Sequence, residues 1–191
     1  ASLETNAHIF EVGIVVADYD VETNQLTNLH KEGFTFDSPS QESLARHISD
    51  ETMDFHRSIR GQDGALRLFT GSEDYPSVGL SEGFDIIRNT LIDVDQLWIN
   101  GLSFDPSRLN SLKRDCPYTH ELWHYRIERD VRTVYSTCRF LFQEKRSAAH
   151  RALEDALWNL DIATRYLNFI HSVKPKAMHH DPHDAPQLPL S

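Results

Sequence analysis

The sequence predicts an α/β fold in which a mixed β-sheet is flanked by helices. Two segments rich in β-branched and aromatic residues come first, at residues 9–19 and 26–36, and they are typical of two strands joined by the turn Asp20–Asn24. Helical periodicity dominates later, above all at residues 147–171, where apolar side chains recur every three or four positions. Strands first and interleaved helices afterwards favour an α/β sandwich.

Shorter elements are predicted between these segments from capping residues, glycines and apolar spacing. In chain order we expect short helices at 40–47 and 49–59, a glycine-containing surface loop at 61–79, an amphipathic helix at 81–92, a short strand at 96–100, and helices at 106–114 and 131–142. Pro106 suits the first turn of the helix that it opens.

The length of 191 residues is that of a single domain. We expect this domain at residues 1–172, followed by a tail rich in Pro and His at residues 173–191 that has no periodic pattern. There is no apolar stretch of membrane-spanning length and no signal-peptide pattern, so we expect a cytoplasmic protein with no membrane partner. The two cysteines, Cys116 and Cys138, lack the spacing of a metal site and are expected to be reduced.

The formal net charge of −10 argues against a protein that coats nucleic acid. Such a protein neutralises many phosphates and is usually basic. An acidic chain is still compatible with an enzyme that holds a few nucleotides at one strand end, where bound divalent cations supply the positive charge.

Three distant segments together contain the groups that two-metal phosphodiester hydrolysis needs. Glu4 lies near the start, Asp105 follows a predicted strand, and His150 precedes Asp155 by five positions at the head of the long helical pattern. Carboxylates are hard oxygen ligands that hold two divalent ions about 4 Å apart. An imidazole suits the role of general base at neutral pH.

These segments resemble the three motifs of the DEDD exonucleases, in the branch that contains a histidine. The first motif, Asp-x-Glu, is matched in part by residues 2–5, the second by residues 100–105, and the third, His-x4-Asp, by His150 and Asp155. Trp123 and the Arg-Asp-Val-Arg-Thr run at 129–133 are similar to a phage and bacterial subgroup of these 3′–5′ exonucleases, as are residues 48–58. The resemblance covers nearly the whole chain.

The resemblance implies a ribonuclease-H-like fold and a metal-dependent exonuclease. Glu4, Asp105 and Asp155 would be the metal ligands, and His150, with Glu4, would act in catalysis. The cofactor would be two Mg²⁺ or Mn²⁺ ions, and the substrate a single-stranded 3′ end of DNA or RNA. Read alone, Asp105 and Asp155 would each be a solvated aspartate favoured by the dipole at a helix start.

Two further groups of residues have two interpretations each. The candidate substrate contacts, which would stack on a terminal base or else pack in the core, are Phe55, His56 and Phe104. The candidates that would shape the site or simply anchor a helix are Arg129, Asp130 and Arg132.

Ser2 stands where the resemblance places the first aspartate. A hydroxyl is a neutral and poor ligand, so affinity for at least one ion should be reduced. Three explanations are open: an inactive relative that still binds a strand end, a deliberately inactivated protein, or first residues that do not belong to the native chain.

The tail ends in Gln187-Leu188-Pro189-Leu190-Ser191, which is similar to the short peptides that bind the bacterial sliding clamp. An extended peptide of this kind would place its two leucines in an apolar groove. A match of five residues also arises by chance.

Overall fold

The computed structural model describes residues 6–142 and 151–173. Ser2, Glu4, His150 and the clamp-like peptide at 187–191 lie outside the described residues. The elements are, in chain order, β1 (Glu11–Asp20), β2 (Gln25–Phe36), α1 (Ser38–Ser43), α2 (Asp50–Thr70), β3 (Ser77–Val78), α3 (Leu80–Leu91), β4 (Leu97–Ile99), α4 (Asp105–Asp115), the 3₁₀ turn η1 (Tyr125–Ile127), β5 (Glu128–Asp130), α5 (Val131–Thr137), the 3₁₀ turn η2 (Arg139–Leu141) and α6 (Ala152–Ser172).

Within the described residues the strands form two small hydrogen-bonded sheets with helices around them. The fold is mixed α/β, as the sequence predicts, although the sequence analysis expected one mixed sheet. In the first sheet β1 pairs antiparallel with β2, and β3 adds a short parallel pairing to the end of β2. In the second sheet β4 and β5 pair in parallel, with Leu97 opposite Glu128 and Ile99 opposite Asp130.

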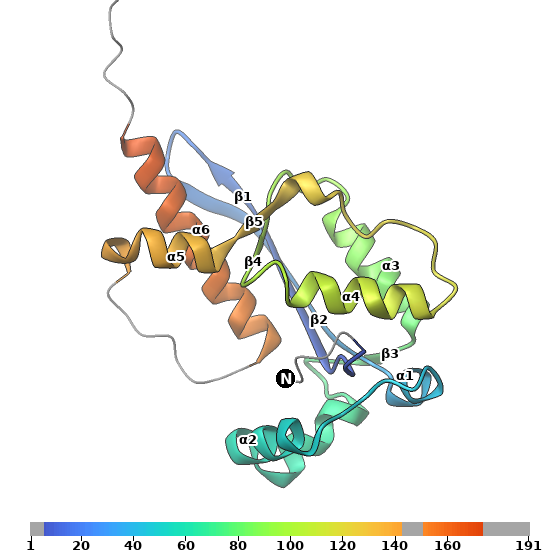
Figure 1. Ribbon diagram of the computed structural model, residues 1–191. Helices are drawn as coiled ribbons and strands as arrows, with labels where there is room; N and C mark the ends of the chain where they lie inside the picture. Colours follow the sequence, from blue (N-terminus) through green and yellow to red (C-terminus); the bar gives the residue numbers. More distant parts are fainter. Residues whose placement is uncertain (1–5, 143–150, 174–191) are drawn as a thin grey trace, which may run out of the picture.

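The two faces of the β1–β2 pair are covered by different helices (Figure 1). Helix α6 contacts β1 and β2 on one face, and α3 contacts the same strands on the other. Side chains alternate along a strand, so neighbours point to opposite faces. Gly13 lies under the backbone of α6, whereas Val12 and Ile14 pack into the cluster around α3.

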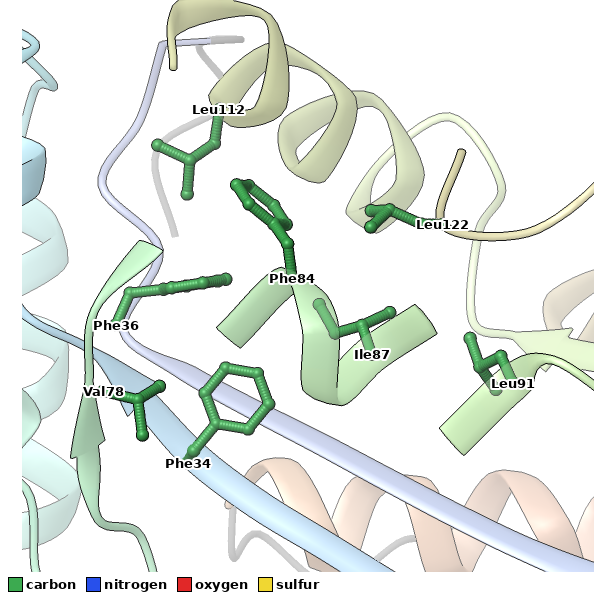
Figure 2. Close-up of a cluster of buried hydrophobic side chains, with 8 residues drawn as sticks. All are labelled: Phe34, Phe36, Val78, Phe84, Ile87, Leu91, Leu112 and Leu122. Carbon is green, nitrogen blue, oxygen red and sulfur yellow. The ribbon is translucent and has the colours of Figure 1, made fainter. Parts of the chain in front are cut away.

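The main hydrophobic core lies between the ends of β2 and β3 and the helices α3 and α4. Figure 2 shows its buried members, which are Phe34, Phe36, Val78, Phe84, Ile87, Leu91, Leu112 and Leu122. The rings of Phe34 and Phe36 meet edge to face with centroids 5.3 Å apart. This geometry is one that aromatic pairs prefer. Phe36 also contacts the ring of Phe84 in α3, with centroids 5.3 Å apart, and this contact joins α3 to the sheet.

A second cluster joins α5 and α6 to β4. Its buried members Val131, Phe142 and Ile162 are surrounded by partly buried side chains that include Trp98 and Trp158. Tyr135 stacks on Phe142 at 5.3 Å between ring centroids. This cluster places α6 beside β4, the strand that leads to Asp105.

One sequence prediction for local structure is wrong, and short strands were missed. The predicted surface loop at 61–79 is helical as far as Thr70, because α2 continues through a kink at Gly61, where φ is +71°. Glycine reaches this left-handed region at little cost, so the residue that suggested a loop allows a bend instead. Strand β5 was not predicted at all, since its three residues, Glu-Arg-Asp, carry no strand pattern.

Among the described residues, no helix is both long enough and apolar enough to span a membrane. Cys116 and Cys138 are free thiols, in agreement with the sequence analysis.

Candidate active site

Asp105 is the first residue of α4, directly after the loop that follows β4. Contacts within a few residues fix this helix start. The Ser107 hydroxyl donates to the carbonyl oxygens of Ser103 and Phe104, both at 2.8 Å. Arg108 donates from Nη1 to the Phe104 carbonyl at 3.0 Å, and its guanidinium carbon lies 3.5 Å from the centre of the Phe104 ring. The ring that the sequence marked as a substrate contact therefore has one face covered by an arginine.

Asp130 connects this loop to α5. One carboxylate oxygen of Asp130 accepts the Gly101 amide at 3.0 Å and the Arg132 amide at 3.1 Å, and the other accepts the Thr133 hydroxyl at 2.6 Å. Gly101 has φ of +95°, a conformation that favours glycine. Asp130 thus caps α5 and holds the loop that ends at Asp105.

The electrostatics of Asp130 agree with this role. Partial burial acts to raise its pKa, but the hydrogen bond from Thr133 and those from neighbouring backbone amides outweigh burial and lower the pKa. Arg129, in contrast, donates to the carbonyl oxygens of Arg126 and Glu128, both at 2.8 Å, within its own segment of the chain.

Asp155 lies in the first turn of α6 and is half-buried. The structure brings it into electrostatic contact with Asp105. Solvent reaches Asp105, but the surrounding protein removes part of its hydration, and this burial is the main cause that raises the pKa of the Asp105 carboxyl. The negative charge of Asp155 raises that pKa further, while the guanidinium groups of Arg108 and Arg132 lower it.

This pair of carboxylates has the chemistry of a site for a hard divalent cation. Two neighbouring carboxylates repel each other, and a dication between them would relieve the repulsion and bind oxygen ligands that it prefers. Among residues 6–142 and 151–173, no group of three or more His, Cys, Asp or Glu side chains is placed to hold a metal ion. Glu4, the third ligand predicted from the sequence, lies outside these ranges. The described part of the chain supplies Asp105 and Asp155.

The other two predicted substrate contacts lie on α2. Phe55 is exposed, and its ring meets that of His56 with centroids 5.5 Å apart. His56 also packs edge-on against Phe10, which precedes β1, at 5.5 Å. His56 is therefore part of an aromatic group at the edge of the sheet, while Phe55 presents a ring to solvent.

The sequence analysis did not identify the residues that hold the start of α6. Glu11 and Tyr75 accept hydrogen bonds from the first amides of that helix. One signal in the sequence pointed to Glu11, which is a single acidic residue within the apolar run at 9–17. A charge within an apolar run that becomes buried is costly unless it is paired. No comparable signal marked Tyr75.

No known protein-family model matches this chain, no curated protein matches it, and no solved structure matches it.

Proposed function

We propose that this protein is a metal-dependent 3′–5′ exonuclease with a ribonuclease-H-like fold, acting on a single-stranded end. The observation that carries the proposal is that Asp155 lies near enough to Asp105 for its charge to raise the pKa of the Asp105 carboxyl. These residues lie in two of the motifs that resemble the DEDD exonucleases, and they come from the first turns of two different helices. The negative charge of Asp155 raises the pKa of the Asp105 carboxyl, and this supports a site that the two residues share.

The arrangement of elements supports the proposed fold. The long last helix packs on the opening strand pair, and the strand that leads to Asp105 lies beside the same helix (Figure 1). Both carboxylates thereby lie at helix starts beside the strands. Asp105 lies at a strand-to-helix junction, between β4 and α4, and in α/β structures ligands often bind at such junctions.

In the proposed reaction each group has a separate task. Water attacks the terminal phosphodiester, the phosphorus bond to the preceding 3′ oxygen breaks, and a nucleoside 5′-monophosphate leaves. His150 would take the proton of the attacking water. Glu4, Asp105 and Asp155 would hold two Mg²⁺ or Mn²⁺ ions, which supply charge stabilisation for the phosphoryl oxygens. Phe55 and Phe104 are candidates to stack on the terminal base.

The test is nucleotide release from matched single-stranded DNA and RNA, each with a free or a blocked 3′ end, in Mg²⁺ or Mn²⁺. We expect release from free ends, and a larger rate in Ser2→Asp, which restores a carboxylate. Asp105→Asn should lower the rate by about 10³-fold, since metal assistance contributes several kcal/mol to a transition state. Asp161→Asn is the matched control on the exposed side of α6, and its rate should stay unchanged. Absence of release by both the parent chain and Ser2→Asp would refute the proposal.

Ser2 favours a second candidate function, a non-catalytic protein that holds a strand end through the same site. Calorimetric titration of Mn²⁺ distinguishes the two candidates. An exonuclease site should bind a pair of ions, whereas the non-catalytic protein should bind one ion weakly or none.

The proposed partners include a sliding clamp, through the peptide at 187–191. A pull-down with the clamp tests this partner. Deletion of the last five residues should abolish capture, and equal capture by the full and the shortened chain would contradict it.

A further inference from the structure

Helix α6 begins without a cap from its own sequence. The residue before its first turn, Arg151, makes no side-chain capping hydrogen bond. The first amides of a helix have no partner within the helix and need one from elsewhere. Here the Ala152 amide donates to Glu11 Oε2 at 3.4 Å, and the Leu153 amide donates to the Tyr75 hydroxyl at 2.9 Å. Both acceptors are distant in the sequence, so the cap is formed by the fold.

The same turn rests directly on the β1–β2 pair. Gly13 and Gly33 are opposite each other in the strand register and share the face under α6. A Cβ added to Gly13 would lie 2.3 Å from the backbone carbonyl carbon of Ala152, and one added to Gly33 would lie 2.8 Å from Leu153 Cδ1. We call the group Glu11, Gly13, Gly33 and Tyr75 the α6 seat. Its glycines allow an approach that a larger residue would prevent.

The carboxylate of Glu11 is itself held firmly. Arg60 of α2 donates to both of its oxygens, from Nη1 at 2.7 Å and from Nη2 at 3.1 Å, and the two side chains are each 9% exposed. Arg151 Nε lies 3.6 Å from Glu11 Oε1, and its guanidinium carbon lies 4.6 Å from the centre of the Tyr75 ring. A negative charge at a helix N-terminus also interacts favourably with the helix dipole. Both parts of the cap are therefore fixed by further contacts.

We propose that Glu11 and Tyr75 are positioning residues that set the place of Asp155 by capping the first turn of α6 from β1 and from the segment before β3. Asp155 belongs to this turn, and its own amide donates to the Arg151 carbonyl at 2.9 Å. The catalytic consequence rests on the function proposed above. A displacement of about 1 Å in a catalytic group is enough to reduce a rate by about 10²-fold.

The experiment compares Glu11→Gln, Tyr75→Phe and the double variant with the parent chain. Asp115→Asn is the matched control, because it weakens one charged contact of the buried Arg46 side chain, 3.1 Å away, at a pair distant in sequence from α6. The first readout is amide hydrogen exchange at Ala152, Leu153 and Asp155. We expect exchange to become about tenfold faster in each single variant. Tyr75→Phe removes the acceptor of the Leu153 amide, and Glu11→Gln removes the charge that strengthens the bond from the Ala152 amide and pairs with Arg60. The control should leave these rates unchanged.

The second readout is steady-state nucleotide release, measured in the parent chain or in the Ser2→Asp background, whichever is active. We expect kcat to fall by about 10- to 100-fold, as for residues that orient a metal ligand, with KM changed by less than about threefold. The Asp115→Asn control should keep kcat.

The outcomes separate this inference from the proposed function. Unchanged exchange in Glu11→Gln and Tyr75→Phe would overturn the cap, whatever the activity. Faster exchange with an unchanged kcat would overturn the positioning role. If neither background releases nucleotide, the exonuclease proposal fails. Mn²⁺-induced broadening at the Asp155 amide then decides the positioning role: broadening that weakens in the variants supports it, and unaltered broadening contradicts it.

Discussion

The first turns of α4 and α6 each present one aspartate of the candidate site, yet they are held in opposite ways. In α4 the contacts around Asp105 come from Ser107 and Arg108, within four residues of the helix start. In α6 the first amides are bound by Glu11 and Tyr75, which lie 141 and 78 positions away. The first turn of α4 is therefore held mainly by its own residues, with Asp130 fixing the loop before it, whereas the first turn of α6 is held by residues distant in the sequence.

This difference has a consequence for mutational sensitivity. A locally fixed turn keeps its shape when distant packing changes, whereas a turn capped by tertiary contacts depends on every element that supplies them. Residues of β1, β2 and α2 should therefore affect Asp155 more than Asp105.

The largest expected effect is that of Gly13→Ala. The added methyl group would lie 2.3 Å from the backbone of Ala152, and backbone atoms cannot move aside as a flexible side chain can. We expect a loss of about 3 kcal/mol in the free energy of unfolding, measured by urea denaturation. Gly79→Ala is the control, because its nearest neighbour is 3.9 Å away, and it should cost less than about 1 kcal/mol. Equal losses for the two variants would contradict the close contact of α6 with β1.

Breaking the ion pair between Arg60 and Glu11 should lower the free energy of unfolding somewhat less than Gly13→Ala does. Arg60→Met leaves the carboxylate of Glu11 with a weaker partner in a site where both side chains are 9% exposed. Breaking a buried pair costs about 3 kcal/mol, but Arg151 at 3.6 Å reduces this, so we expect about 2 kcal/mol. Arg57→Met provides the comparison on the same helix. It removes a 2.8 Å pair with Asp54 whose side chains are 47% and 73% exposed, and it should cost less than about 1 kcal/mol. If Arg57→Met lowers the free energy of unfolding as much as Arg60→Met, the pair of Arg60 with Glu11 has no special role at the α6 seat.

Substitutions around Asp105 should affect stability less, but their effect on the pKa of the Asp105 carboxyl tests the geometry of the site more directly. The negative charge of Asp155 raises this pKa, so Asp155→Asn should lower it. The positive charge of Arg108 lowers the same pKa, so Arg108→Met should raise it. Carboxyl ¹³C titration by NMR measures both shifts. If the pKa of Asp105 shifts in the same direction in both variants, the first turns of α4 and α6 do not bring the two carboxylates together.

The pH dependence of metal binding follows from the same pKa and should be the mildest effect. A carboxylate must lose its proton to bind a cation. Because the pKa of Asp105 is raised, Mn²⁺ affinity should already decline at a pH where an ordinary aspartate would remain fully ionised, and it should decline at a lower pH in Asp155→Asn. Titration of Mn²⁺ at several pH values measures this decline. An identical pH profile in the parent and in the variant would contradict the coupling of the two carboxylates.

Much of the local structure could be predicted from the sequence. The apolar runs of β1 and β2 and the periodicity of α3 and α6 gave their elements to within a few residues, and Pro106 marked the start of α4. These features depend on residues that are close in the sequence, so the pattern of a short segment is enough to predict them. Asp105 was placed at a helix start for the same reason.

Features that depend on distant partners could not be predicted in this way. Strand β5 has three polar or charged residues and becomes a strand through its pairing with β4. The continuation of α2 past Gly61 is also a tertiary effect, since Ala65 and Leu68 beyond the kink are buried. Tyr75 acts on α6 across the fold, and nothing near it in the sequence indicates that role.

The most direct test of a shared metal site is Mn²⁺ titration of the isotopically labelled chain, followed by amide NMR, in the parent and in Asp105→Asn. Paramagnetic broadening falls off with distance from the ion. If Asp105 and Asp155 hold one cation site, resonances in the first turns of α4 and α6 will lose intensity together, at the same Mn²⁺ concentrations. Asp105→Asn will weaken the broadening at α6 although the substitution lies on α4. Broadening of one turn without the other, or broadening at α6 that is unaltered in Asp105→Asn, would contradict the account.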